Sequence, residues 1–311
     1  MVTEGIEFID AKPETVIDYL KSRVTEKIEV NPANLKIING GRFLVLQLMN
    51  GKIKEYPVRR TFLYKLLRWY GFPLGQLSKL STESVTSICN DYLMNIKRGK
   101  VIVKTEKDEA LSILSPDYNE ITDLDIISEV AALGVRNISR NDFFLSITTE
   151  DKIKTEPVPG DKCGVGFNIV NSETGFRALT VLHYILRYVC SNGAYTRISD
   201  GDDNIRYHYG KEDLKLFLTE KVEKAEADRA LMISKLTKLN ENKVSKSKEY
   251  YIKKIETVLG KREAAIFLDD FTNELTQYEL FNLITSNAKH YDLSKRYFLE
   301  SVAGEIIFGV N

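Results

Sequence analysis

Changes in the spacing of apolar residues divide the chain into a mixed first part and a helical last part. The run ETVIDYLKS, residues 14–22, has the apolar spacing of a short amphipathic helix. Two alternating runs follow, LKIING and RFLVLQLMNGKIKEYPV, and the Asn-Gly pair in the second is typical of a type I′ hairpin turn. In RTFLYKLLRWYG, residues 60–71, the period becomes helical, and Gly71 suits the position just after a helix.

The middle of the chain predicts further short strands and helices. Ser81 is a suitable N-cap for a helix that ends before Gly99. KVIVKT and EALSIL have the length of a strand hairpin, SPDYNEIT predicts a turn, and DLDIISEVAALG predicts a helix after it. FFLSITT predicts another strand. From Lys211 onward the strand signals cease, and runs rich in Lys and Glu have helical spacing.

These elements predict an α+β fold. We expect a mixed or antiparallel sheet with packed helices over residues 1–210, followed by a largely helical region, residues 211–311, that packs on it. Because no long linker rich in Pro, Gly or Ser separates the two parts, one continuous domain is the alternative.

One segment, NIVNSETGFRALTVLHYILRYVCSNG at residues 168–193, places three basic groups in an otherwise apolar run. As two strands joined by NSETG, it puts Arg177, His183 and Arg187 on one face, because strand residues alternate between faces. As a helix, it would keep only His183 and Arg187 together. The row is either a platform for phosphates or a set of cations paired with carboxylates of a packing helix.

Composition excludes several classes of protein. With 311 residues, 43% hydrophobic and 28% charged, the chain can bury a substantial core, and no apolar stretch is long enough to span a membrane. The start lacks the pattern of a signal peptide, so we expect a cytoplasmic protein. Three distant cysteines and three histidines predict neither a disulfide framework nor a metal site. The Lys, Glu and Ile content favours a thermophilic source.

Charge is unevenly distributed although the net charge is zero. Residues 52–104 contain eleven basic and three acidic residues, a balance of +8, whereas residues 105–130 contain eight acidic residues and one lysine, a balance of −7. The first segment can form a local positive surface for a polyanion. Alternatively, the two segments pack together and neutralise each other.

The helix predicted within the basic segment combines cations with aromatic rings. Its phosphate-binding candidates are Arg59, Arg60, Lys65 and Arg68, and its base-stacking candidates are Tyr64, Trp69 and Tyr70. Together with Arg177, His183 and Arg187, these are the residues that we expect to contact nucleic acid. The alternative is a purely structural role, in which the aromatic rings belong to the core and the cations are solvated.

No catalytic motif identifies a reaction. The chain has no P-loop, no dinucleotide-binding glycine pattern, no zinc-protease motif and no nucleophile elbow. The acidic run SPDYNEITDLD could bind a divalent cation, but helix capping and turn formation explain its carboxylates more simply. We therefore expect no catalytic residue, no metal and no cofactor.

The order of several motifs resembles the phage/plasmid-like domain-of-unknown-function family numbered 932. The motifs are FLYKLLRWYGFPLGQLSKLS, ICNDYLMN, ALSILSPDYNEITDLDII, GFNIVNSETGFRALTVLHYILRYVCSNGAY, RYHYG and LTQYELFNLITSNAKHYDLSKRYFLESVAGEIIF, covering about residues 56–310. The resemblance implies a protein of phages, plasmids and related mobile elements, with roles in replication and recombination. Positions that match the family without an assigned role are Asn171, Ser172, Glu173, Arg187, Cys190, Asn192, Gly193 and His208.

Three hypotheses for function follow. The first is a non-catalytic protein that binds nucleic acid, with single-stranded DNA favoured, in mobile-element replication or recombination, strand annealing included. The second is a metal-dependent enzyme that acts on a nucleotide or phosphorylated substrate. The third is an anti-defence interaction protein whose helical last third contacts a host partner. An oligomer is compatible with all three.

Overall fold

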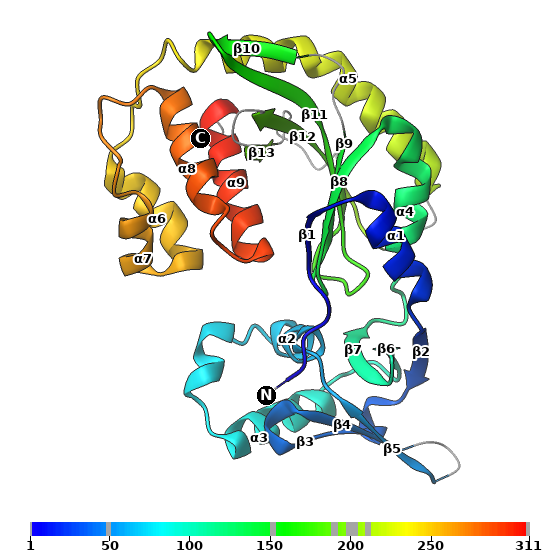
Figure 1. The fold of residues 1–311 in the computed structure, drawn as a ribbon. Helices are drawn as coiled ribbons and strands as arrows, with labels where there is room; N and C mark the ends of the chain where they lie inside the picture. Colours follow the sequence, from blue (N-terminus) through cyan, green and yellow to red (C-terminus); the bar gives the residue numbers. More distant parts are fainter. Residues whose placement is uncertain are drawn as a thin grey trace.

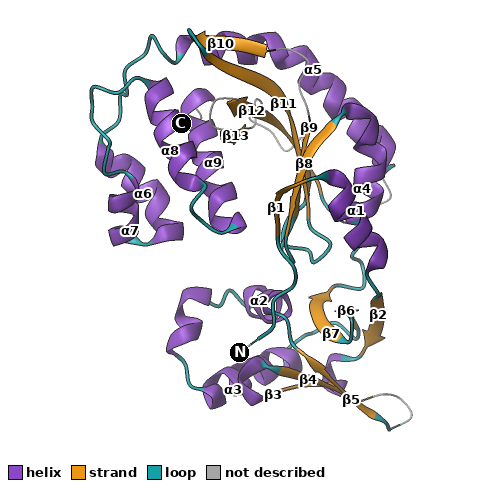
Figure 2. Ribbon diagram, in the orientation of Figure 1, coloured by secondary structure: helices purple, strands orange, loops and turns teal. Residues whose placement is uncertain are grey.

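Residues 2–47, 51–149, 154–187, 192–196, 205–208 and 213–308 are described by the computed structural model of the chain (Figure 1). They form two lobes. The larger lobe is a long antiparallel sheet with helices on both faces, and the smaller lobe consists of two short sheets with helices beside them (Figures 1 and 2).

The large sheet has the strand order β1-β8-β9-β11-β12-β13, with β10 paired to β11 and β14 paired to β12, all antiparallel. Its strands are β1 (Phe8–Ala11), β8 (Val135–Arg140), β9 (Leu145–Thr149), β10 (Lys154–Val158), β11 (Asp161–Asn171), β12 (Leu179–Arg187), β13 (Asn192–Thr196) and β14 (Ile205–Arg206). The hairpin of β11 and β12 is its centre. Phe167 pairs with His183, and Cys163 pairs with Arg187 at the far end.

Helices cover both faces of this hairpin, because its residues are apolar on both sides. Leu179 and Val181 of β12 pack against Phe217 and Leu218 of the long helix α5. The alternate residues, such as Leu182, pack with residues of α9. The helices of this lobe are α1 (Pro13–Ser22), α4 (Asp123–Val130), α5 (Leu214–Lys238), α6 (Lys248–Leu259), α7 (Lys261–Phe267), α8 (Gln277–Ala288) and α9 (Leu293–Phe308).

The smaller lobe is a single inserted segment between α1 and α4. One sheet has the order β2-β6-β7 and the other the order β3-β4-β5. Its elements are β2 (Thr25–Val30), β3 (Leu35–Ile38), β4 (Phe43–Gln47), β5 (Ile53–Pro57), α2 (Arg60–Trp69), α3 (Thr82–Met94), β6 (Val101–Glu106) and β7 (Glu109–Leu114). Short 3₁₀ turns cover Pro32–Asn34, Asn39–Gly41, Leu74–Lys79 and, in the larger lobe, Ala131–Leu133. The lobe has its own apolar core, which includes Phe62, Leu66 and Cys89.

The predicted α+β class is confirmed, with antiparallel sheets and a helical C-terminal region. The residues predicted to start and end helices occupy those positions in the structure. Ser81 caps α3 by accepting a hydrogen bond from the Ser84 backbone N–H at 3.1 Å, and Gly71 has a φ of +68° just after α2. The tip of the predicted Asn-Gly hairpin, residues 48–50, lies outside the described residues. No helix within the described ranges has both the length and the apolar character needed to cross a bilayer.

Candidate ligand-binding site

The turn between β11 and β12, Asn171–Gly175, is held firmly where the two lobes meet. The Ser172 hydroxyl donates to the Phe143 carbonyl at 2.6 Å, and the Thr174 hydroxyl donates to the Asp142 carbonyl at 2.8 Å. Gly175 adopts a φ of +75°, a left-handed conformation that glycine adopts without steric cost. Residues of this turn contribute to two regions of very different electrostatics, a buried ionic cluster and an open pocket.

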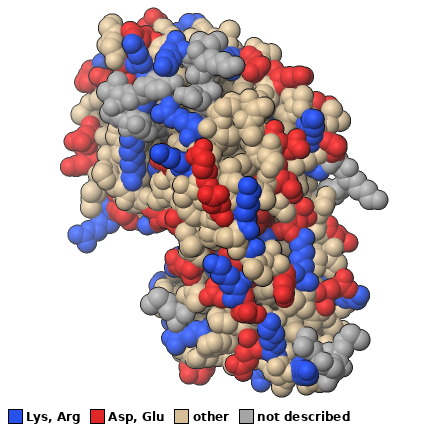
Figure 3. Space-filling model, turned by 45° about the vertical axis from the view of Figure 1, so that its right-hand side comes forward, with Lys and Arg blue, Asp and Glu red and all other residues tan. Residues whose placement is uncertain are grey.

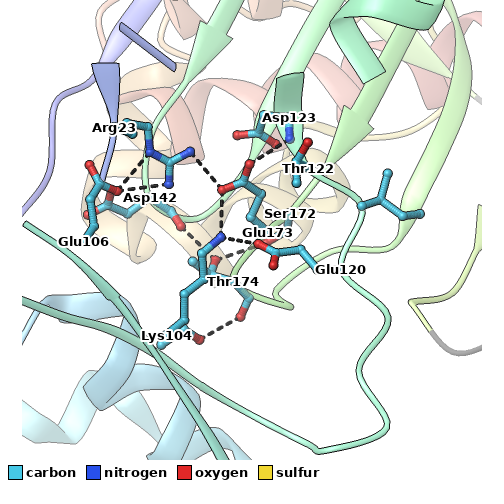
Figure 4. Close-up of polar contacts among 12 residues, drawn as sticks. Arg23, Lys104, Glu106, Glu120, Thr122, Asp123, Asp142, Ser172, Glu173 and Thr174 are labelled. Carbon is cyan, nitrogen blue, oxygen red and sulfur yellow. Dashed lines mark hydrogen bonds and ion pairs between the residues drawn. The ribbon is translucent and has the colours of Figure 1, made fainter. Parts of the chain in front are cut away.

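The buried ionic cluster is centred on Glu173 (Figure 4). Its carboxylate accepts hydrogen bonds from Lys104 Nζ and Arg23 Nη1, both at 2.9 Å, and from the Asp123 backbone N–H at 2.7 Å. Burial alone would raise the pKa of Glu173, but the Lys104 ammonium and the Arg23 guanidinium outweigh burial and lower that pKa well below its usual range. Glu173 is therefore ionised and paired in the folded protein.

Further pairs extend the cluster across the junction of the lobes. Arg23 contacts Glu106 at 3.0 Å, and Arg59 at the start of α2 contacts Asp142 at 3.1 Å and Glu109 at 2.7 Å. Because Arg59, Lys104 and Glu106 belong to the smaller lobe while Asp142 and Glu173 belong to the larger one, these pairs connect the two lobes. Because the charges of the cluster satisfy one another, loss of one member would leave its partners buried and uncompensated.

The open pocket has a volume of about 530 Å³. It lies where α2, the end of β7 and the β11–β12 turn meet, and it has a wall of cationic and aromatic side chains. Its lining residues are Lys65, Trp69, Tyr70, Ile96, Lys97, Arg98, Leu114, Ser115, Tyr118, Gly175, Phe176, Arg177, Ala178, Tyr207 and His208. No aspartate or glutamate is found among these described lining residues, although four of them are Lys or Arg.

Lys65 projects from α2 against the turn. Its ammonium donates to the Gly175 carbonyl and lies 5.3 Å from the centre of the Phe176 ring. Burial, together with the nearby Arg68 guanidinium, lowers the pKa of Lys65 to about 8. A substantial fraction of this amine is therefore neutral at mildly alkaline pH.

Two arginines flank Lys65. The Arg68 guanidinium lies 5.5 Å from the centre of the Phe176 ring, and that of Arg177 lies 4.4 Å from the centre of the Tyr297 ring and 4.9 Å from that of Phe144. Within the described part of the chain, Lys65, Arg68 and Arg177 form no ion pair. They are held by aromatic rings and a carbonyl, so their charge is free to meet an anion.

Exposed aromatic rings line the mouth of the pocket. Trp69, Tyr70 and Tyr207 are 38%, 36% and 56% exposed. Tyr70 is fixed by a stack on Tyr92, with ring centres 4.3 Å apart, and by a 2.7 Å hydrogen bond from its hydroxyl to the Tyr92 carbonyl. Large flat rings that remain in contact with water are suited to stacking on a planar ligand.

Tyr118 and His208 form the inner wall. Their rings stack with centres 4.8 Å apart, and the His208 backbone carbonyl accepts a 2.7 Å hydrogen bond from the Asn119 N–H. Burial lowers the pKa of His208 to about 4, so its imidazole is neutral at physiological pH. The inner wall therefore adds polar but uncharged groups to the cationic pocket.

The structure separates the residues that we expected to contact nucleic acid. Lys65 and Arg68 both lie beside the Phe176 ring, whereas Arg177 lies against the rings of Phe144 and Tyr297. Tyr64 packs near the Phe143 ring at 6.0 Å, and Arg60, although exposed, pairs with Glu4. Arg59 is only 4% exposed, and the three carboxylates that surround its guanidinium leave no room for a phosphate.

The predicted row of Arg177, His183 and Arg187 does not form, and this is a correction. Arg177 precedes β12, which begins at Leu179. His183 is buried on the face covered by α5, and burial together with Arg229 lowers its pKa to about 4. Arg187 pairs with Asp161 at 2.5 Å. The alternative interpretation, cations paired with carboxylates of a packing helix, does not describe the row either, because His183 is uncharged and the partner of Arg187 belongs to the neighbouring strand β11.

The positions that match the family motif have mainly structural contacts. Asn171 is fully buried, and its side-chain amide donates to Asp123 at 3.1 Å. Ser172 and Glu173 shape the turn, and His208 lines the pocket. Cys190 lies outside the described residues, and for Asn192 and Gly193 the structure gives the backbone, which pairs with Arg187 and Leu186 of β12.

The acidic run after β7 does not assemble into a metal site. Glu120 pairs with Lys104 and Lys27, Asp123 accepts from Arg140 at 2.9 Å, and Asp117 contacts Arg98 at 3.3 Å. Across the residues that the structure describes, no group of three or more His, Cys, Asp or Glu is placed to hold a metal ion. The opposite charges of residues 52–104 and 105–130 thus partly neutralise each other, as the alternative interpretation holds.

Sequence reasoning missed several pocket residues, namely Lys97, Arg98, Tyr118, Phe176 and Tyr207. Phe176 could have been predicted, because an aromatic residue directly after the tight turn at Gly175 must lie close to any element that packs on that turn. The others come from separate loops whose convergence has no periodic signature.

Compared with protein-family models, curated proteins and solved structures, the chain has no significant match. The resemblance to the family numbered 932 therefore stays an expectation from the sequence.

Proposed function

We propose that this protein binds single-stranded nucleic acid, with DNA favoured, and that the pocket beside the Asn171–Gly175 turn receives part of the strand. The observation that carries the proposal is a pocket lined by Lys65 and Arg177 and by exposed aromatic rings, with Arg68 beside the lining residue Phe176. None of these three cations has a carboxylate partner among the described residues. Phosphates would meet the cations, and bases would stack on the rings.

Size and chemistry favour a single strand over a duplex. A pocket of about 530 Å³ is in the range of sites for small planar ligands, so it can take one nucleotide with its base turned outward from the strand. Stacking on an aromatic side chain contributes about 1–3 kcal/mol per base, and this contribution needs an unpaired base. In a duplex the base faces are already stacked on their neighbours.

The face of the molecule shown in Figure 3 offers a polyanion no extended positive surface. Lys and Arg are interspersed with Asp and Glu over the face shown in Figure 3, so this face carries no continuous positive surface. A role in mobile-element replication or recombination, with strand annealing as one form of it, comes from the family resemblance and is part of the proposal.

The test is retention of a labelled oligothymidylate of about 20 nucleotides across a range of salt concentrations. We expect binding at low ionic strength, and the double substitution Arg68→Ala/Arg177→Ala should reduce the slope of log affinity against log salt by up to about two. Lys54→Ala is the matched control, because Lys54 is an exposed cation that pairs with Asp108 at 2.9 Å away from the pocket. Absence of retention at low salt, or equal losses in both variants, would refute the proposal.

A further inference from the structure

Lys65 differs chemically from the other cations of the pocket. It is a primary amine, and at mildly alkaline pH part of it is neutral, whereas a guanidinium stays charged. Its only hydrogen-bond partner given by the structure is the Gly175 carbonyl, and within the described chain no carboxylate pairs with it. A neutral lysine amine in a pocket is a nucleophile for carbonyl compounds.

The position of this amine is tightly defined. A methyl group placed on Gly175 would lie 2.8 Å from Lys65 Nζ and 3.3 Å from its Cε, so the end of the side chain rests directly on the turn. Because the turn is anchored by Ser172 and Thr174, the amine has a fixed place in the wall of the pocket. Arg177 lines the same pocket and supplies a charge for an anionic group of the same ligand.

We propose that Lys65 captures phosphorylated aldehydes as a covalent imine. The inference rests on the proposed function for one source of such an aldehyde, which is the open-chain sugar of an abasic nucleotide within a bound single strand. A free phosphorylated aldehyde with a planar ring is the other source. Both present a phosphate for Arg177 and a carbonyl carbon for the amine.

The chemistry is balanced without a co-reactant. The lone pair of Lys65 Nζ forms a bond to the carbonyl carbon, and the carbonyl oxygen takes up a proton to give a carbinolamine. The second amine proton and the hydroxyl group then leave as water while the carbon–nitrogen double bond forms. Addition of water reverses the step and releases the lysine.

The experiment traps the imine with cyanoborohydride and detects the product on a denaturing gel. A single strand with one abasic site is the first probe, the intact strand is its control, and pyridoxal 5′-phosphate is the free aldehyde. Lys65→Arg keeps the positive charge but cannot form the imine, so trapping of both aldehydes should fall at least about tenfold. Lys54→Arg, which changes an exposed lysine outside the pocket, should trap as the parent does.

Peptide mapping of the trapped product decides the assignment. Label on Lys65 from both probes supports the inference, and label from pyridoxal 5′-phosphate alone supports it for free aldehydes. Equal trapping by Lys65→Arg, or label on other lysines, would overturn it. If the intact strand binds and neither aldehyde is trapped, the inference fails while the proposed function stands. If the intact strand does not bind but pyridoxal 5′-phosphate labels Lys65, the proposed function fails instead.

Discussion

Lys104 and Lys65 are two lysines drawn away from water beside the same turn, and their surroundings are opposite. Lys104 is 2% exposed and lies between Glu120 and Glu173. Lys65 meets a carbonyl and an aromatic ring and has no carboxylate partner among the described residues. The first ammonium is neutralised within the fold, whereas the second retains its charge for a ligand.

The two lysines thus have different roles: the charge of Lys104 is used in ion pairs within the fold, whereas the charge of Lys65 is available to a ligand. A buried ion pair repays the cost of desolvation only when its partners are in place, so the Glu173 cluster depends on every member. An unpaired cation at a pocket costs the fold some stability and gains binding capacity in return. The lowered pKa of Lys65, due to burial and Arg68, is the physical sign of that cost.

The largest expected effect is a loss of folding stability when the ion-paired cluster loses Glu173. Glu173→Ala leaves Lys104 and Arg23 buried without their shared carboxylate, and we expect it to reduce the free energy of unfolding by about 3–5 kcal/mol. Lys65→Ala removes a cation that has no ionic partner, so its effect should stay within about 1 kcal/mol. Urea unfolding of both variants measures the two values. Similar losses from the two substitutions would contradict the distinction.

A smaller effect comes from pH and the carboxylates of the cluster. Burial alone would raise the pKa of Glu106, but Arg23 and Arg59 lower it below its usual value. A carboxyl group with a lowered folded-state pKa contributes stability above its unfolded pKa of about 4.3 and loses that contribution as the pH falls further. The free-energy difference between the parent and Glu106→Gln should therefore be about 1.5–3 kcal/mol at neutral pH and shrink below about pH 4.

Urea unfolding at several pH values between about 3 and 7 tests this pH dependence. Lys65→Ala serves as the comparison, because its amine is protonated in both folded and unfolded states over that range, and its difference from the parent should not change. A difference for Glu106→Gln that is constant with pH would show that its pairing does not depend on ionisation.

The smallest expected effect is a pH dependence of strand affinity that comes from Lys65. Because the pKa of Lys65 is lowered to about 8, its positive charge is lost as the pH rises through that value. Affinity for a single strand should then fall several-fold, on the order of one lost phosphate contact, between about pH 7 and 9. Lys65→Arg should bind with little pH dependence over the same range, and an equally steep fall in that variant would assign the effect to another group.

The sequence by itself determined the local elements. Start and stop signals such as Ser81 and Gly71, and the glycine turn of NSETG, act through neighbouring backbone atoms, so helices α2 and α3 and the β11–β12 hairpin could be predicted. The α+β class followed from the order of these elements. The strand pattern also placed His183 and Arg187 on one face of β12 correctly, but it could not show that α5 covers that face.

Only the tertiary structure decided which charges are paired and which are available. Lys104 meets Glu173 across 69 positions of the chain, and Lys65 meets Gly175 across 110. Nothing local distinguishes these two lysines, because electrostatic pairing depends on distance in space and burial. The boundaries of the smaller lobe could not be predicted from the sequence either. No linker marks them, and the apolar residues of its core are of the same kind as those of the larger lobe. The pocket exists because the turn and α2 fold against each other. Their contact leaves Lys65 and Arg177 in its lining, and Arg68 beside Phe176, with no described acid to neutralise them.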